Sequence, residues 1–293
     1  MNITKAVIPV AGKGTRFLPA SKQVPKEMLP LIRKPIILYV VEELVSSGIE
    51  EVIFVTSAEK SIIENFFDRN LVLEKFLEEN KKYKELELIQ NIGNMVDIIS
   101  VRQKEQLGLG HAVLCAEKII GKHSFAVALG DEVIHGPNPA TKQLKKVSEK
   151  NKGSSVIGVM EVKKSDVSKY GIIGGVETSD DKTIKMTSMI EKPSIEEAPS
   201  CLATPGRYVF NSNIFECLRN IKKGTGGEYQ LTDAINMLKD SENVFAYKFE
   251  GTRFDTGNVP AYLDATVEMA LLSDEYSSLM QDIIRDKIRK FNI

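Results

Sequence analysis

Glycines and cations near the N-terminus have the types and spacing needed to bind phosphate. Gly12 and Gly14 follow a short apolar run, and glycine permits backbone torsions and close approaches that larger residues prevent. The N–H groups of such a loop can turn inward onto an anion. Arg16 adds a rigid fork of donors that fits phosphate oxygens, and Lys26 adds a mobile cation. We therefore predict a phosphate-binding loop at the carboxyl end of a first strand, where open α/β sheets bind ligands.

This loop differs from two better-known phosphate-binding motifs. A dinucleotide fingerprint would need a third glycine at the position of Phe17. A P-loop has a glycine, four further residues and then Gly-Lys-Ser/Thr, and the Gly-Lys-Gly-Thr at residues 12–15 does not supply this pattern. A glycine pair alone would indicate only a tight turn. Its combination with Arg16, Lys26 and spaced prolines favours ligand binding.

Two later segments have side chains suited to nucleotide and metal chemistry. Gln103 lies just before Gly108 and Gly110, and its amide has a donor side and an acceptor side that complement a nucleobase edge. Asp131 ends an apolar strand at 124–131. Mg²⁺ is commonly held by one or two carboxylates plus phosphate oxygens. The motif alone fits equally well with a carboxylate that caps the following segment.

Motifs in the second half have ordinary structural explanations when each is taken alone. Glu191 and Lys192 could be an exposed surface pair. Glu228 could be a carboxylate at a helix start, where negative charge is favourable. Asp255 could be a turn residue, because an aspartate shortly before a glycine, here Gly257, is common in turns.

Taken together, these segments resemble the sugar-phosphate nucleotidyltransferases, and most closely the bacterial UTP–glucose-1-phosphate uridylyltransferases. The resemblance rests on Val-Ala-Gly-Lys-Gly-Thr-Arg-Phe-Leu-Pro at 10–19, on Pro-Lys-Glu-Met-Leu-Pro at 25–30, and on later motifs in the same order. It covers roughly residues 4–270. It implies a reaction in which UTP and glucose 1-phosphate give UDP-glucose and pyrophosphate.

The resemblance also implies roles for individual residues. Lys192 is expected to act both in the reaction and in binding the sugar phosphate. Glu132 is left out of the metal-ligand set, because close relatives often have Pro-Asp-Val where this chain has Gly-Asp-Glu. The expected catalytic residues are Arg16, Lys26 and Lys192. The expected nucleotide-binding residues are Ala11, Gly12, Gly14, Thr15, Gln103, Gly108 and Gly110. The expected sugar-binding residues are Gly171, Glu191, Lys192 and Glu228, and the expected Mg²⁺ ligands are Asp131 and Asp255.

Two alternatives remain open from the sequence. The chain could transfer a thymidylyl or another nucleotidyl group, or use another hexose phosphate. It could also be a non-catalytic sugar-nucleotide sensor. A sensor derived from this family should lack metal or phosphate ligands, whereas all of the expected ones are present.

The elements that must position these residues alternate between strands and helices, which is typical of a parallel sheet. A helix follows Pro35, strands occupy 52–56 and 96–101, and residues 59–87 have a helical pattern. The apolar stripe that we expect to be buried there comprises Phe66, Phe67, Leu71, Leu73, Phe76 and Leu77. Further strands are expected at 154–160, 169–175, 186–190, 206–210 and 244–249.

We therefore predict an α/β fold with a Rossmann-like mixed, mostly parallel sheet flanked by helices over residues 1–258. A helical C-terminal extension over 259–293 should serve packing or oligomerisation, so we expect a homo-oligomer, either a dimer or a tetramer. The 39 basic and 40 acidic residues nearly balance, which argues against nucleic acid or a membrane as partner. The three cysteines have no disulfide or metal spacing, and neither a signal peptide nor a membrane span is evident, so we expect a cytoplasmic protein.

Overall fold

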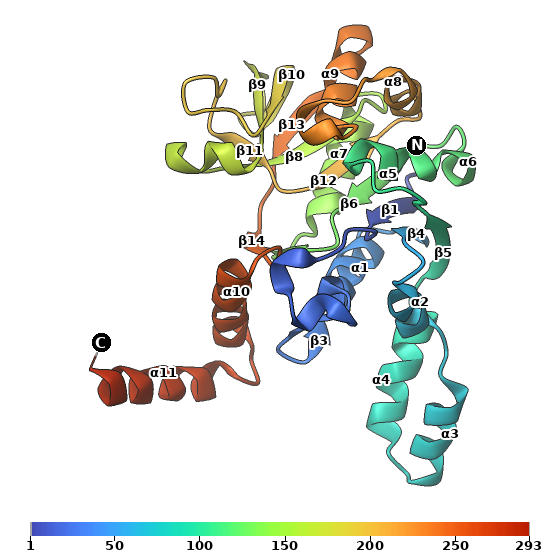
Figure 1. Ribbon diagram of the computed structural model, residues 1–293, viewed down its shortest axis with the longest axis vertical. Helices are drawn as coiled ribbons and strands as arrows, with labels where there is room; N and C mark the ends of the chain where they lie inside the picture. Colours follow the sequence, from blue (N-terminus) through green and yellow to red (C-terminus); the bar gives the residue numbers. More distant parts are fainter. Residues whose placement is uncertain (1, 293) are drawn as a thin grey trace.

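Ten strands form the central sheet of the computed structural model, which describes residues 2–292 (Figure 1). Four neighbouring strands pair in parallel in the order β5–β4–β1–β6, and they provide the edge at which the predicted phosphate loop and Asp131 lie. Their bounds are β1 (Lys5–Pro9), β4 (Glu51–Thr56), β5 (Asp97–Arg102) and β6 (Phe125–Ala128). This arrangement is the Rossmann-like half of the sheet.

The other half of the sheet contains both pairing directions. β12 runs antiparallel to β6 and β8, β13 runs parallel to β8, and β10 runs antiparallel to β13 and β9. These strands, with the edge strand β11, are β8 (Val156–Glu161), β9 (Gly171–Glu177), β10 (Thr183–Glu191), β11 (Leu202–Thr204), β12 (Arg207–Phe210) and β13 (Phe245–Lys248). The predicted α/β class with a mixed sheet is confirmed.

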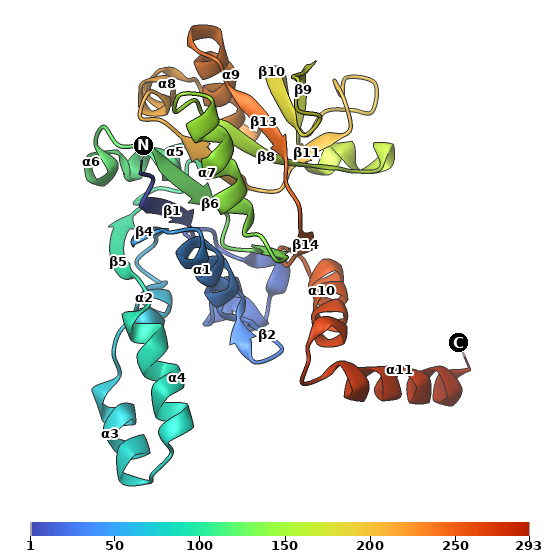
Figure 2. The ribbon, with the colours of Figure 1, turned by 180° about the vertical axis from the view of Figure 1, so that it is seen from behind.

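Helices cover both faces of the sheet, and each face has its own hydrophobic core (Figures 1 and 2). Strand β1 illustrates the division, because Val7 packs with one core while Ala6 and Ile8 pack with the other. Burial on both faces explains the continuous apolar run in the sequence. The covering helices are α1 (Ile36–Ser46) and α7 (Ala140–Lys150) on one face, and α5 (Leu109–Cys115), α8 (Ile214–Asn220) and α9 (Leu231–Ser241) on the other.

The shorter elements complete the description. Two ribbons stand apart from the main sheet, one joining β2 to β3 and one joining β7 to β14. The ribbons comprise β2 (Pro30–Leu31), β3 (Lys34–Pro35), β7 (Glu132–His135) and β14 (Thr252–Asp255). The short helices are α6 (Glu117–Ile120), η1 (Thr15–Phe17), η2 (Ala20–Lys22), η3 (Lys26–Met28), η4 (Lys164–Lys169) and η5 (Thr225–Gly227).

The helical pattern over residues 59–87 is confirmed. The apolar stripe that we expected to be buried is only partly buried. Phe67 and Leu77 are buried, whereas Leu71 and Phe76 are 67% and 52% exposed. The reason is that α2 (Ser61–Phe67) lies near the sheet, while α3 (Leu71–Glu79) and α4 (Tyr83–Asn94) project from it and pack on each other (Figure 1). A helical hairpin covers only the sides on which its two helices meet.

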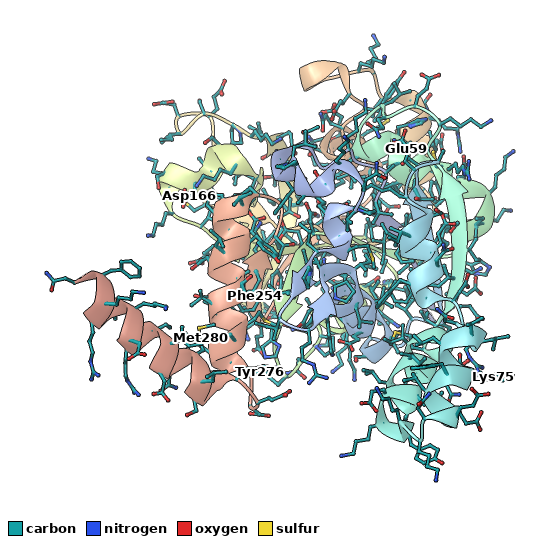
Figure 3. All side chains as sticks on the ribbon, turned by 60° about the horizontal axis from the view of Figure 1, so that its bottom comes forward. Glu59, Lys75, Asp166, Phe254, Tyr276 and Met280 are labelled. Carbon is teal, nitrogen blue, oxygen red and sulfur yellow. The ribbon has the colours of Figure 1, made fainter. Side chains whose placement is uncertain are left out.

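Two helices form the C-terminal part of the chain. α10 (Val259–Leu272) packs on β14 and β2, whereas none of the residues of α11 (Ser277–Phe291) is buried. Figure 3 shows Met280 on α11, which stands away from the body, and Phe254 close to α10. Across residues 2–292 no helix combines the length and apolar character needed to cross a membrane. The division at residue 258 stays a prediction, although α10 does begin at Val259.

Candidate active site

Two adjoining cavities lie at the carboxyl ends of the parallel strands. The first, of about 330 Å³, is lined by the glycine loop and by the loop after β5, and we call it the glycine-loop cavity. The second, of about 500 Å³, is lined by acidic and basic side chains, and we call it the carboxylate cavity. Leu109 and Glu228 line both cavities, so the two spaces share a wall.

The glycine-loop cavity brings together four of the residues predicted to bind nucleotide. Ala11 and Gly12 line one side, and Gln103 and Gly108 line another. Nε2 of Gln103 donates to the carbonyl of Gly108 at 3.1 Å and lies 3.0 Å from Nδ1 of His111. These contacts engage the Nε2 group and hold the amide in one place against the cavity.

The other three residues predicted to bind nucleotide are close to these in the sequence but line neither cavity. Gly14 has φ +64, and its carbonyl accepts a hydrogen bond from the hydroxyl of Ser21, so it shapes the turn. Thr15 is exposed at the start of η1. The N–H of Gly110 donates to the carbonyl of Tyr229 at 2.8 Å, and a Cβ at position 110 would lie 2.7 Å from that oxygen. Gly110 therefore allows two loops to pack closely.

The carboxylate cavity contains both predicted metal ligands. Asp131 follows β6, and Asp255 ends β14, which pairs antiparallel with β7. A Cβ built at Gly257 would lie 3.0 Å from Oδ2 of Asp131 and 3.1 Å from Oδ1 of Asp255. Both carboxylates thus face one small space that stays open because residue 257 is glycine.

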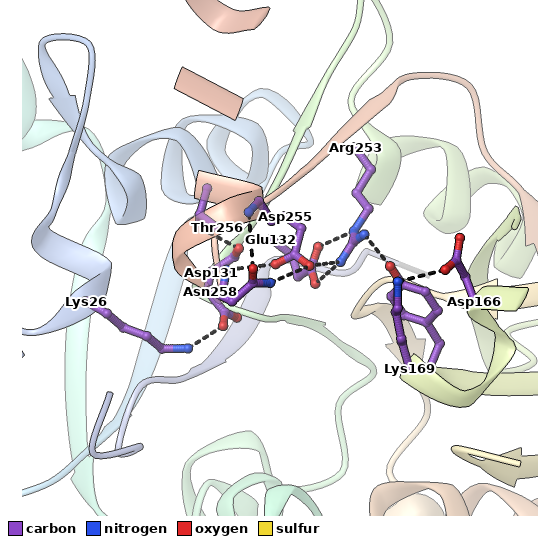
Figure 4. A network of polar contacts seen from close by, with 12 residues as sticks. Lys26, Asp131, Glu132, Asp166, Lys169, Arg253, Asp255, Thr256 and Asn258 are labelled. Atoms are coloured by element: carbon purple, nitrogen blue, oxygen red, sulfur yellow. Dashed lines mark hydrogen bonds and ion pairs between the residues drawn. The ribbon is translucent and has the colours of Figure 1, made fainter. Parts of the chain in front are cut away.

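Lys26 reaches the same space and forms an ion pair with Asp131 (Figure 4). Burial alone would raise the pKa of Asp131, but the adjacent ammonium of Lys26 outweighs it and holds that pKa below its ordinary value. Burial likewise disfavours the charged lysine, yet Asp131 raises the pKa of Lys26 above its usual value. Both groups are therefore ionised at neutral pH.

Glu132 lies beside these residues in an ion pair with Arg253. Nε and Nη2 of Arg253 donate to the two carboxylate oxygens, each at 2.6 Å, and the side chains are only 11% and 12% exposed. Burial raises the pKa of Glu132 to about 7, and the charges of Asp131 and Asp255 also raise it, while Arg253 opposes the shift. Because Arg253 binds both oxygens of Glu132, this carboxylate is not available to coordinate a metal ion. Glu132 is instead the ion-pair partner of Arg253.

The predicted sugar-binding residues also line the carboxylate cavity. Gly171 and Glu191 are partners in the antiparallel register of β9 and β10. The hydroxyl of Thr232 donates to Oε2 of Glu191 at 2.8 Å and orients that carboxylate. Lys192 follows, more than half exposed, and Arg16 lines the cavity together with it.

The donor set fits a hard divalent cation of the Mg²⁺ type. Within residues 2–292 no group of three or more His, Cys, Asp and Glu side chains is arranged to hold a metal. Two carboxylates facing one gap are nevertheless what Mg²⁺ commonly uses when substrate phosphates and water supply the other oxygens. Asp131 and Asp255 would be the residues that hold it.

Comparison with known proteins agrees with this geometry. A protein-family profile described as Nucleotidyl transferase matches residues 5–271. The chain belongs to the nucleotidyl transferase family. The family expected from the sequence motifs is thus confirmed.

Relatives of this nucleotidyl transferase carry closely related names. The UTP–glucose-1-phosphate uridylyltransferase YngB of Bacillus subtilis is 46% identical, over 98% of this chain and 96% of its own length. A structure described as UTP-bound UGPase from Acinetobacter baumannii has a TM-score of 0.89 at 41% identity, covering 97% of this chain and 99% of its own. A UDP-glucose pyrophosphorylase complexed with UDP-glucose has a TM-score of 0.85 at 38% identity, covering 93% and 100%.

Sequence reasoning missed several residues that shape the site of this nucleotidyl transferase. Arg207 is fully buried, and it donates from Nε to Glu43 and from Nη2 to the carbonyl of Glu132, each at 2.7 Å. It thereby braces the segment that carries Asp131. A buried pair of this kind has no local sequence signal, because its partners come from α1 and β12. Gly257 did have a signal, since it closes the Asp-x-Gly motif of Asp255.

Proposed function

We propose that this nucleotidyl transferase converts UTP and glucose 1-phosphate to UDP-glucose and pyrophosphate. The observation that carries the proposal is the pair of adjoining cavities with Glu228 in their common wall. One offers a glycine loop and an amide to a nucleotide, and the other offers carboxylates and cations to a metal and a sugar phosphate. The names of the relatives, and the UTP and UDP-glucose bound in two similar structures, support the same substrates.

The chemistry follows from the charges that line the carboxylate cavity. A phosphate oxygen of glucose 1-phosphate attacks the α-phosphorus of UTP in line, and pyrophosphate leaves. The attacking phosphate is already anionic at neutral pH, so the step needs no strong general base. The protein contributes positioning and neutralisation of charge.

Each cation has a place in this scheme. Lys192 holds the phosphate of the sugar, Lys26 gathers the reacting phosphates, and Arg16 lies along the departing pyrophosphate. A Mg²⁺ ion at Asp131 and Asp255 supplies further neutralisation of the phosphate charge when bound. Lys26 is ion-paired to Asp131 in the structure, so its ammonium lies beside a residue that would hold the metal.

Assembly and location are also part of the proposal. We expect a second copy of the chain to cover the apolar side chains that α10 and α11 expose, which gives a dimer or a tetramer. The exposed side chains are Val259, Leu263, Val267, Leu272, Leu279, Ile283, Ile288 and Phe291. Use of UTP agrees with a cytoplasmic location.

A substrate panel tests the proposed reaction. Pyrophosphate release is measured with UTP, dTTP, ATP, CTP and GTP against glucose, galactose and mannose 1-phosphates, with and without Mg²⁺. We expect turnover with UTP and glucose 1-phosphate to exceed every other pair and to require the metal. Equal turnover of dTTP and UTP would contradict the uridylyl assignment, and metal-independent turnover would contradict the Mg²⁺ site.

A further inference from the structure

Arg253 joins three parts of the carboxylate cavity that are far apart in the sequence. Its Nε and Nη2 donate to Glu132 on β7, and its Nη1 donates to the hydroxyl of Tyr170 at 2.9 Å. Nη2 also lies 3.3 Å from Oδ2 of Asp255. Figure 4 shows the guanidinium between the acidic side chains and the segment of Lys169. One rigid side chain thus contacts the metal-ligand segment and the sugar-side turn together.

Tyr170 carries this connection to Lys192. The carbonyl of Tyr170 accepts a hydrogen bond from the N–H of Lys192 at 2.9 Å. Lys192 has φ +47, in the left-handed region that residues with a side chain rarely adopt. Such a conformation persists only where surrounding contacts impose it, and it is common at functional sites. The position of Tyr170 therefore helps to decide where the ammonium of Lys192 stands.

Glu132 keeps Arg253 in this geometry. Without Glu132, the guanidinium would be drawn to its next nearest carboxylate, Asp255, and would compete with a cation there. With Nε and Nη2 bound to the two oxygens of Glu132, Nη1 is directed toward the hydroxyl of Tyr170. A lysine at position 253 could not engage both oxygens of Glu132 in the same way, since an ammonium has no planar fork.

We propose that Arg253 and Tyr170 are positioning residues that fix Lys192 relative to Asp131 and Asp255, with Glu132 orienting Arg253. The proposal rests on the proposed function, because Lys192 matters as the group that binds the phosphate of glucose 1-phosphate. It predicts that damage to the Arg253–Tyr170 contact weakens sugar-phosphate binding and leaves UTP binding nearly unchanged.

Tyr170→Phe is the least disruptive test, because it removes only the hydroxyl. We expect KM for glucose 1-phosphate to rise about tenfold, the size expected for one hydrogen bond to a charged group, with KM for UTP within about twofold. UDP-glucose binding measured by calorimetry should weaken in parallel. Tyr39→Phe is the matched control, since it removes a hydroxyl that donates to the carbonyl of Leu31 at 2.8 Å outside both cavities. The control should leave both KM values unchanged.

A double-mutant cycle tests whether the two residues act together. Arg253→Lys should also raise KM for glucose 1-phosphate by about tenfold, and the double variant Tyr170→Phe/Arg253→Lys should be no worse than about tenfold, because coupled residues are non-additive. Additive losses, or equal rises in both KM values, would refute the positioning role. If the wild-type protein turns over UTP with glucose 1-phosphate but Tyr170→Phe changes nothing, this proposal alone fails. If the wild-type protein has no such turnover, the proposed function fails.

Discussion

The glycine loop and the carboxylate pair, which we propose bind the same substrates, are held in very different ways. Gly12 and Arg16 are exposed, and a Cβ at position 12 would meet no atom within 4 Å. Asp131, by contrast, is ion-paired to Lys26, and its carbonyl accepts from both the hydroxyl and the N–H of Thr256, at 2.6 and 3.0 Å. Oδ1 of Asp255 accepts from the N–H of Gly257 at 2.7 Å.

This difference separates two tasks. The carboxylates are oriented before any substrate arrives, so no free energy is spent on reorganising them during the reaction. The glycine loop, by contrast, has open space around Gly12, where we propose that a phosphate fits. Substitutions at the carboxylates should therefore mainly reduce kcat and metal binding, and substitutions in the loop should mainly affect nucleotide binding.

The largest effect is expected from Asp131→Asn. It removes one proposed metal ligand and leaves Lys26 without its ion-pair partner, so turnover should fall by a factor of about a thousand or more. Circular dichroism checks that the protein stays folded, and activity is measured over a range of Mg²⁺ concentrations. Activity restored by saturating Mg²⁺ would show that Asp131 is not essential to the metal site.

Gly257→Ala should come next. The added Cβ would stand between the two carboxylates, at about 3 Å from each, and would exclude a cation from the gap. We expect kcat/KM to fall about a hundredfold, comparable with loss of one transition-state contact. Direct Mn²⁺ binding in the presence of UTP, followed by electron paramagnetic resonance, should weaken as well. Unchanged Mn²⁺ binding would mean that the metal sits elsewhere.

Arg16→Ala tests the exposed glycine loop rather than the partly buried carboxylates. Removing a cation that faces the transferring phosphates should lower kcat by about ten- to a hundredfold. The side chain is exposed, so the melting temperature should stay within about 1 °C, in keeping with surface substitutions elsewhere. Arg16→Lys is the matched control and should recover part of the rate. A drop in melting temperature with normal kcat would assign Arg16 a structural role instead.

The smallest effects are expected from two neighbouring glycines. Gly12→Ala should fold normally, because the added methyl group meets nothing, and should raise KM for UTP about tenfold if a phosphate approaches there. Gly14→Ala should instead lower the free energy of unfolding by about 1–2 kcal/mol, because residue 14 has φ +64. Urea unfolding and steady-state kinetics on both variants distinguish these results. The same outcome for both would remove the distinction between ligand space and turn geometry.

The local parts of this structure were predictable from the sequence, and the long-range pairings were not. Strand β1 and the loop after it follow from an apolar run that ends in Gly12 and Gly14. The closeness of Asp131 and Asp255 came only from the family resemblance, since it depends on the pairing of β7 with β14. The exposure of Leu71 and Phe76 could not be predicted, because periodicity shows which face of a helix is apolar but not what covers it.

The connection between Asp255 and α10 has a mechanical consequence. Asn258 follows the carboxylate by three residues, and its Oδ1 caps α10 by accepting from the N–H of Ala261 at 3.1 Å. Its Nδ2 lies 3.5 Å from Oδ2 of Asp255. Asn258 therefore connects the start of α10 to the carboxylate of Asp255. The same side chain thus serves both the start of a C-terminal helix and the orientation of a residue that lines the carboxylate cavity.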